Sequence, residues 1–194
     1  MKKYDAIIVG AGPAGIFTAL ELIGRAPNKK IVILEKGKAV ENRKCPKIVT
    51  KKCVNCKPYC NITTGFSGAG AFSDGKLSLS CEVGGNLPEL IGEEYAQEMI
   101  HYTDKIYLRF GADEKVEGVS HKDKIKEIRK RAIQSGLKLV DCPIRHLGTE
   151  KAQGLYLKIE QELLNNGVEI LFEHSCIDVS VQEGICTGVT ARND

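Results

Sequence analysis

Four cysteines lie close together in the first third of the chain, at Cys45, Cys53, Cys56 and Cys60, with the spacing C-x7-C-x2-C-x3-C. Four thiolates suit zinc or an iron–sulfur cluster, whereas a disulfide needs two. The spacing differs from that of ferredoxin runs, so it leaves the metal open between zinc and iron–sulfur. A redox disulfide and free structural thiols are the alternatives.

The residues around these cysteines are basic and polar. Nearby cations lower the pKa of thiols and offset the negative charge of a four-thiolate site. A segment with so little apolar surface has little to bury, so a metal would supply its folding free energy. The basic residues are Arg43, Lys44, Lys47, Lys51, Lys52 and Lys57.

A second chemical pattern, "GAGPAG", begins at Gly10, between the apolar run 5–9 and an apolar helical pattern. Such a strand, glycine-rich turn and helix can cradle a pyrophosphate. Gly10 permits the tight turn, Gly12 lets a phosphate approach the backbone, and Gly15 lets the helix lie close to the strand. Pro13 suits the first helical turn, where its missing N–H costs nothing.

An acidic residue follows the next apolar run. Residues 31–34 read as a buried strand, and Glu35 stands at its end, twenty residues past Gly15. A carboxylate there accepts hydrogen bonds from ribose hydroxyls and repels a 2′-phosphate. Together these features predict an adenine dinucleotide, either NAD or FAD.

The stretch after Glu35 distinguishes the two cofactors. An NAD domain would continue with another helix and strand, but here the polar cysteine segment and "GFSGAGAFSDGK" follow. This departure favours a flavin. The second glycine-rich stretch nearly spells a P-loop, but Leu77 stands where a Ser or Thr should reach magnesium. A flexible surface loop is the other alternative, although Phe66 and Phe72 suggest that the loop packs on something.

The stretches "IIVGAGPAGIFTALEL", "LEKG", "GFSGAGAFSDGKL", "RHLGTE" and "NNGVEILFE" resemble glutathione-reductase-like flavoproteins. Within them, the chain is similar to a largely uncharacterised family of FAD-dependent dehydrogenases or NAD(P)/FAD-dependent oxidoreductases. The resemblance implies the N-terminal part of a longer enzyme. It also implies FAD contacts at Gly10, Gly12, Pro13, Ala14, Gly15, Glu35 and Lys36, second-loop contacts at Gly68, Gly70, Ala71 and Ser73, and a backbone contact to adenine at Cys176.

The expected fold class is α/β: a Rossmann-like three-layer FAD/NAD(P)-binding domain with a cysteine-rich excursion and a C-terminal β-hairpin. We expect a single domain over 1–194, with its nucleotide-binding core at 1–40 and 146–194, a Cys/Gly-rich excursion at 41–80 and a helical insert at 86–136. We expect helices at 89–110 and 150–164, and a basic helix that ends near Arg131 and begins with a capping box of Ser120 and Asp123. We expect strands at 137–142 and 168–172, and a hairpin of 177–181 with 185–190.

The composition and charge of the chain limit the classes of partner that we expect. Twenty-eight Lys and Arg against twenty-five Asp and Glu leave a net charge of +3, which argues against nucleic acid. The apolar run near the N-terminus is interrupted by Pro13 and glycines, so we expect neither a signal peptide nor a membrane span, and place the chain in the cytoplasm. Structural disulfides are disfavoured there.

The sequence predicts an FAD-dependent oxidoreductase, with NAD(P)H as a candidate electron donor and an unidentified small-molecule substrate or electron carrier. Most of its chemistry would belong to the flavin, so we name no catalytic base. By the resemblance, Arg145 and His146 are candidates for an acid or anion-binding role, with a structural role as the alternative. The competing function is a non-enzymatic binding module, stabilised by metal, with a vestigial nucleotide fold.

Overall fold

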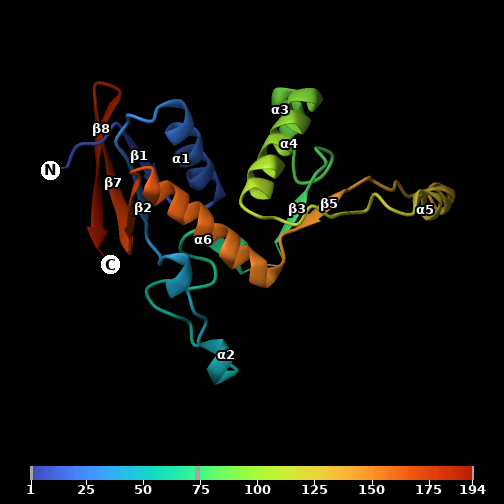
Figure 1. Ribbon diagram of the computed structural model, residues 1–194, viewed down its shortest axis with the longest axis horizontal. Coiled ribbons are helices and arrows are strands. Elements are labelled where there is room, and N and C mark those ends of the chain that lie inside the picture. Colours follow the sequence, from blue (N-terminus) through green and yellow to red (C-terminus); the bar gives the residue numbers. More distant parts are fainter. Residues whose placement is uncertain (1, 73–74, 194) are drawn as a thin grey trace. The chain divides into compact units, whose positions relative to one another are not determined.

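The computed structural model describes residues 2–72 and 75–193 (Figure 1). The chain divides into two compact units, one of Met1–Ser73 with Ala152–Asp194 and the other of Asp74–Lys151. The sequence predicts one domain over 1–194 with a helical insert at 86–136, and this domain assignment stays a prediction. That insert falls within the second unit, whereas the cysteine segment belongs to the first.

The first unit is built on a parallel sheet of β1 (Ala6–Val9), β2 (Ile31–Glu35) and β6 (Glu169–Phe172), in the order β1-β2-β6. All five residues of the central strand β2 are buried, as its continuous apolar run predicts. The register pairs Glu35 with Phe172, so the strand expected at 168–172 does join the sheet of β1 and β2.

Two helices belong to this sheet unit (Figure 1). Helix α1 (Pro13–Arg25) connects β1 to β2, and α6 (Thr149–Asn165) leads into β6. The apolar spacing that predicts each helix also gives each a buried face. The buried side chains are Ile16, Ala19 and Leu20 on α1, and Ala152, Leu155, Tyr156, Ile159 and Leu163 on α6.

After β6 the chain forms an antiparallel hairpin of β7 (His174–Gln182) and β8 (Ile185–Asn193). Glu183 and Gly184 make the turn with φ values of 50° and 79°, the positive range that tight hairpin turns require. The expected hairpin is therefore present, and both strands are longer than the sequence predicts.

The segment that leaves β2 contains three short helices: the 3-10 helices η1 (Val40–Asn42) and η2 (Gly68–Ala71), and α2 (Lys47–Thr50). Residues 44–60, all of them described, include no buried residue. Figure 1 shows α2 well away from β1 and β2. The cysteine segment thus extends from the sheet with almost no core of its own.

The second unit contains helices α3 (Leu87–Ile91) and α4 (Glu93–Arg109), and an antiparallel sheet of β3 (Lys76–Ser78), β5 (Ile144–His146) and β4 (Val116–Glu117). The single helix expected at 89–110 is wrong, because Gly92 takes a φ of 85° and separates the two helices.

The strand expected at 137–142 is also wrong. Leu137 is 65% exposed, so the apolar run there has no face to bury. The strand lies instead at β5, which pairs with both β3 and β4.

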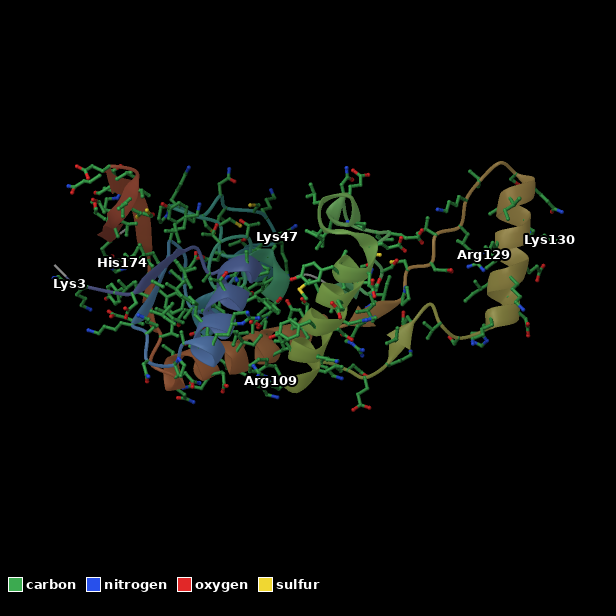
Figure 2. The ribbon with its side chains drawn as sticks, turned by 90° about the horizontal axis from the view of Figure 1, so that it is seen from above. Lys3, Lys47, Arg109, Arg129, Lys130 and His174 are labelled. Carbon is green, nitrogen blue, oxygen red and sulfur yellow. The ribbon has the colours of Figure 1, made fainter. Side chains whose placement is uncertain are left out.

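Helix α5 (Lys122–Gln134) carries the basic run and has no buried residue among those described. Figure 2 shows Arg129 and Lys130 on this helix, apart from α4. The Ser120–Asp123 capping box does not form, because His121 takes the cap position with a left-handed φ of 60°. Across the described chain, no helix combines the length and apolar character needed to span a membrane.

Candidate functional site

The turn between β1 and α1 gives its three glycines different roles. Gly10 has a φ of 96°, a conformation that side chains disfavour. A Cβ on Gly12 would meet no described atom within 4 Å, whereas one on Gly15 would lie 2.0 Å from the carbonyl oxygen of Gly10. Gly12 therefore borders open space, and Gly15 makes the close contact between helix and turn. Pro13 stands in the first turn of α1, beside N–H groups that the helix leaves free for an anion.

The carboxylate of Glu35 holds this turn against the end of β2. It is 5% exposed and accepts a hydrogen bond from the backbone N–H of Ala11 at 2.8 Å and from that of Gly37 at 2.7 Å. A carboxylate has about four acceptor positions, so two remain after these bonds. Glu35 can therefore order the turn and still accept hydroxyl groups.

A cavity of about 500 Å³ lies at this end of the sheet, within the usual range for small-molecule sites. It brings together four of the residues that the sequence singles out for the cofactor: Gly10, Glu35, Lys36 and Cys176. We call it the nucleotide cavity. Its lining is Val9, Gly10, Leu34, Glu35, Lys36, Tyr59, His174, Ser175, Cys176, Ile177 and Arg192.

The most informative lining residue that sequence reasoning missed is Tyr59. Its hydroxyl lies 2.8 Å from Oγ of Ser175, which is buried on β7. Nζ of Lys36 lies 4.9 Å from the centre of its ring, within cation–π range. No periodicity marks Tyr59, because its place depends on a partner 116 positions away. The cysteine segment thus supplies one wall of the nucleotide cavity.

The second glycine-rich loop is tied to the first. The backbone N–H of Ser67 donates to the carbonyl of Ala11 at 2.7 Å, and Oγ of Ser67 accepts from the N–H of Ala71 at 3.1 Å. Ser67 and Ala71 are fully buried. The loop is therefore packed against the fingerprint turn, unlike the flexible surface loop considered as an alternative.

The predicted cofactor residues of this loop differ in their surroundings. A Cβ on Gly68 would meet a single described atom within 4 Å, at 3.9 Å, so Gly68 borders open space. A Cβ on Gly70 would lie 3.0 Å from the hydroxyl of Tyr156 on α6, so this glycine makes room for a protein side chain. Ala71 is buried in the interior. Ser73 lies outside the described residues.

Arg43 fixes the base of the cysteine segment. Its buried guanidinium donates to the carbonyls of Asn61 at 2.9 Å, Ile62 at 2.6 Å and Phe66 at 2.5 Å. Burial lowers the pKa of this guanidinium from its ordinary value. Since Arg43 precedes the segment and these carbonyls follow it, one side chain joins the two ends.

The four cysteines of the segment are free thiols that line one cavity of about 130 Å³. We call it the cysteine pocket. Backbone hydrogen bonds from Ile62 and Thr63 lower the pKa of the Cys60 thiol. Across the described residues, however, no three His, Cys, Asp or Glu side chains are grouped closely enough to hold a metal ion. The lining is Cys45, Pro46, Lys47, Cys53, Val54, Asn55, Cys56, Lys57, Cys60 and Asn61.

A third cavity, of about 450 Å³, lies between the other two. It shares Lys36 and Tyr59 with the nucleotide cavity. It shares Cys56, Lys57 and Asn61 with the cysteine pocket. The third cavity therefore connects the cysteine pocket to the nucleotide cavity through shared lining residues, all within the first unit.

Arg145 and His146 lie in the second unit, on β5. The buried guanidinium of Arg145 forms an ion pair with Asp104, with one contact at 2.8 Å, and this bond raises the pKa of Arg145. Nε2 of His146 lies 3.1 Å from a carboxylate oxygen of Glu117. These partners favour the structural role for Arg145, whose charge is already neutralised.

No family model matches the chain. A curated protein of Marinomonas mediterranea, named "Putative FAD-dependent oxidoreductase LodB", is 35% identical over 81 residues, which are 41% of this chain and 21% of that protein. An uncharacterised protein of Clostridium beijerinckii is 41% identical over 78 residues, 39% of this chain and 14% of its own length. The match therefore spans a minor part of each curated relative.

Solved structures share the fold at low identity. The chain superposes on an L-amino acid deaminase from Proteus vulgaris with a TM-score of 0.52 and 16% identity, covering 100% of this chain and 45% of that one. For a 3-ketosteroid-delta4-(5alpha)-dehydrogenase from Rhodococcus jostii the TM-score is 0.59 at 12% identity, covering 98% and 42%. For a glycine oxidase from Bacillus cereus it is 0.50 at 16%, covering 97% and 53%. The chain thus spans about half of each of these three proteins.

Proposed function

We propose that this chain binds FAD and forms the cofactor-binding part of an FAD-dependent oxidoreductase. The observation that carries the proposal is the nucleotide cavity, where the glycine turn, the buried Glu35 and the start of β7 meet. The relative named as an FAD-dependent oxidoreductase supports this assignment. So does the fold shared with an oxidase and a dehydrogenase.

The residues present fit an adenine dinucleotide. The open space at Gly12 and the start of α1 would receive the pyrophosphate, since the helix leaves its first N–H groups free. The two remaining acceptor positions on Glu35 would receive the ribose hydroxyls. The backbone at Cys176 would border the adenine, and Gly68 would approach the far side of the pyrophosphate. Bound FAD would supply hydride and electron transfer at its flavin ring.

The reductant and the substrate belong to the proposal too. We propose a small-molecule substrate, with NADH or NADPH as the candidate donor to the flavin. Anaerobic mixing of the FAD-loaded protein with each nucleotide would bleach the flavin absorption if that nucleotide is the donor. Retention of the yellow colour with both would remove NAD(P)H from the proposal.

The non-enzymatic module predicted as the alternative finds no support in the comparisons. It predicts a vestigial nucleotide fold, yet Gly12 and Glu35 retain the space and the acceptor positions that a dinucleotide needs. Absence of FAD affinity in the purified protein would restore this alternative.

Gly12→Val tests the site directly. The backbone of Gly12 has a φ of −74°, which any residue adopts, and the added side chain would point into open space. We expect the variant to fold with an unchanged melting temperature and to lose FAD binding. FAD released from denatured protein and FAD titration measure this loss, with NAD and Mg-ATP titrated in parallel. Wild-type FAD affinity in Gly12→Val, or binding of Mg-ATP in place of FAD, would overturn the proposal.

A further inference from the structure

We propose that the cysteine pocket is a four-thiolate metal site and that its metal fixes Tyr59 as a wall of the nucleotide cavity. The ligands would be Cys45, Cys53, Cys56 and Cys60. This inference goes beyond the proposed function, because it assigns a second site and a coupling between the two sites.

The first observation is that the structure gathers the thiols without a disulfide. All four are free, and all four line the same 130 Å³ cavity, although Cys45 and Cys60 are separated by the whole segment. The fold therefore places all four cysteines along one small cavity. The other free thiols, Cys81, Cys142, Cys176 and Cys186, lie elsewhere.

The second observation is that the segment has no buried core of its own. Arg43 joins its two ends, but residues 44–60, all described, include no buried residue. Ile48 and Val49 are 73% and 83% exposed, so even its apolar residues contribute no core. Ordering the backbone of such a segment costs conformational entropy. A metal that cross-links four points of the segment would offset that cost.

The chemistry of the lining selects the kind of metal. Thiolates are soft ligands that suit zinc or iron–sulfur clusters, and the pocket contains no carboxylate or imidazole among its lining residues. Lys47 and Lys57 also line it, and their charges would offset part of the negative charge of four thiolates. On binding, four S–H bonds would break, four metal–sulfur bonds would form, and four protons would pass to solvent. The thiols must close inward, because as they stand they do not form a ligand group.

The coupling rests on Tyr59. It lies between Cys56 and Cys60 in the sequence, and it lines both the nucleotide cavity and the cavity beside it. Its hydroxyl contacts Ser175 at 2.8 Å. A metal held by the cysteines on either side would therefore hold the tyrosine in the position that the nucleotide meets.

The metal is tested first, on the full chain purified without oxygen. We expect one equivalent of zinc by elemental analysis, or iron with matching sulfide, and this measurement separates the two chemistries. Metal-free protein should take up one equivalent of Zn²⁺, or of Co²⁺ with the visible bands of tetrahedral thiolate coordination. Cys53→Ser and Cys56→Ser should lose the metal, whereas Cys186→Ser, on the exposed face of β8, should keep it. Native protein with neither zinc nor iron that also takes up no Zn²⁺ would overturn the site, as would a disulfide between two of the four cysteines.

The coupling is tested by titrating FAD into metal-free and metal-loaded protein. Coupling between two sites typically changes affinity by about 5- to 150-fold, so we expect FAD to bind at least about fivefold more tightly to the loaded form. Tyr59→Ala should keep the metal and abolish this difference. Equal FAD affinity in the two wild-type forms would refute the coupling. Failure of both forms to bind FAD would sink the proposed function, while the metal content would still decide the metal site.

Discussion

At the residue scale, the structure gives Glu35 a structural role beside the ribose contact that we propose for it. The motif predicts a ribose ligand, and the structure adds hydrogen bonds to the backbone of Ala11 and Gly37. A buried carboxylate needs such partners, because desolvation without hydrogen bonds is costly. The same side chain thus shapes the turn and presents acceptors to the cavity.

Glu35→Ala should weaken both roles. Loss of hydrogen bonds to a charged acceptor costs about 1.5–3 kcal/mol, so FAD affinity should fall about ten- to a hundredfold. The two buried N–H groups would also lose their acceptor, so the melting temperature should fall even without FAD. Isothermal titration and thermal unfolding measure the two effects separately. Glu41→Ala, an exposed acid six residues later, is the control, and wild-type FAD affinity in Glu35→Ala would refute the ribose assignment.

Single residues were predictable where their role depends on close neighbours in the sequence. Gly10, Gly12 and Gly15 occupy one turn, so their spacing alone predicts the positive φ of Gly10 and the close contact at Gly15. The phosphate contact at Gly12 stays a prediction. Gly70 was expected beside the cofactor, yet its neighbour is Tyr156, on a helix far away in the chain. Arg43 is one of several basic residues near the cysteines, and nothing local in the sequence indicates that it joins three carbonyls.

At the element scale, the contact between α1 and the fingerprint turn sets how closely the helix approaches the sheet. Gly15→Ala would place a methyl group 2.0 Å from the carbonyl oxygen of Gly10, a backbone atom that cannot move alone. Overpacking of this kind costs about 1–3 kcal/mol or more, so the free energy of unfolding should fall by at least that amount.

Gly24→Ala in the same helix is the matched control, because its Cβ would meet no described atom within 4 Å. Replacing a helical glycine by alanine there should stabilise the protein by up to about 1 kcal/mol. Urea unfolding of both variants measures the contrast. Equal stability of the two variants would show that Gly15 does not lie in close contact with the carbonyl oxygen of Gly10.

The elements themselves were predictable where one face is buried along a regular pattern, as for β2, α1 and α6. The prediction of one helix at 89–110 does not take Gly92 into account, and the positive φ of this glycine separates two helices. The strand at 137–142 was expected from apolar residues that have no surface to cover. Periodicity predicts an element only when the rest of the fold offers it a partner.

At the scale of the whole molecule, long-range contacts decide what the sequence leaves open. The cysteine segment reaches β7 through Tyr59 and Ser175, and Val40, after β2, reaches α6 through Glu160. Neither contact has a local signal, because its partners are more than a hundred positions apart. The division into two compact units is likewise a property of contacts rather than of composition.

The contact at Glu160 should control how the stability of the protein depends on pH. This carboxyl is 4% exposed, accepts from the N–H of Val40 at 3.4 Å, and has a pKa that burial raises from 4.5 to about 7. Between these two values the folded chain binds more protons than the unfolded chain, so the free energy of unfolding decreases as pH rises. The difference between 4.5 and about 7 corresponds to a loss of about 3 kcal/mol across that window.

Glu160→Gln should remove this dependence, because its amide cannot ionise yet keeps an oxygen for Val40. Asp5 and Glu169 have lowered pKa values, so their contributions change below about 4.5 and do not overlap the window. We therefore expect the variant and the wild type to have similar stability near pH 4, and the variant to be more stable at pH 8 by about 3 kcal/mol. Urea unfolding across this range measures the difference, with Glu183→Gln at the exposed hairpin turn as the control. Parallel pH profiles for wild type and Glu160→Gln would mean that Glu160 is ionised in the folded chain and that its burial costs far less than the structure implies.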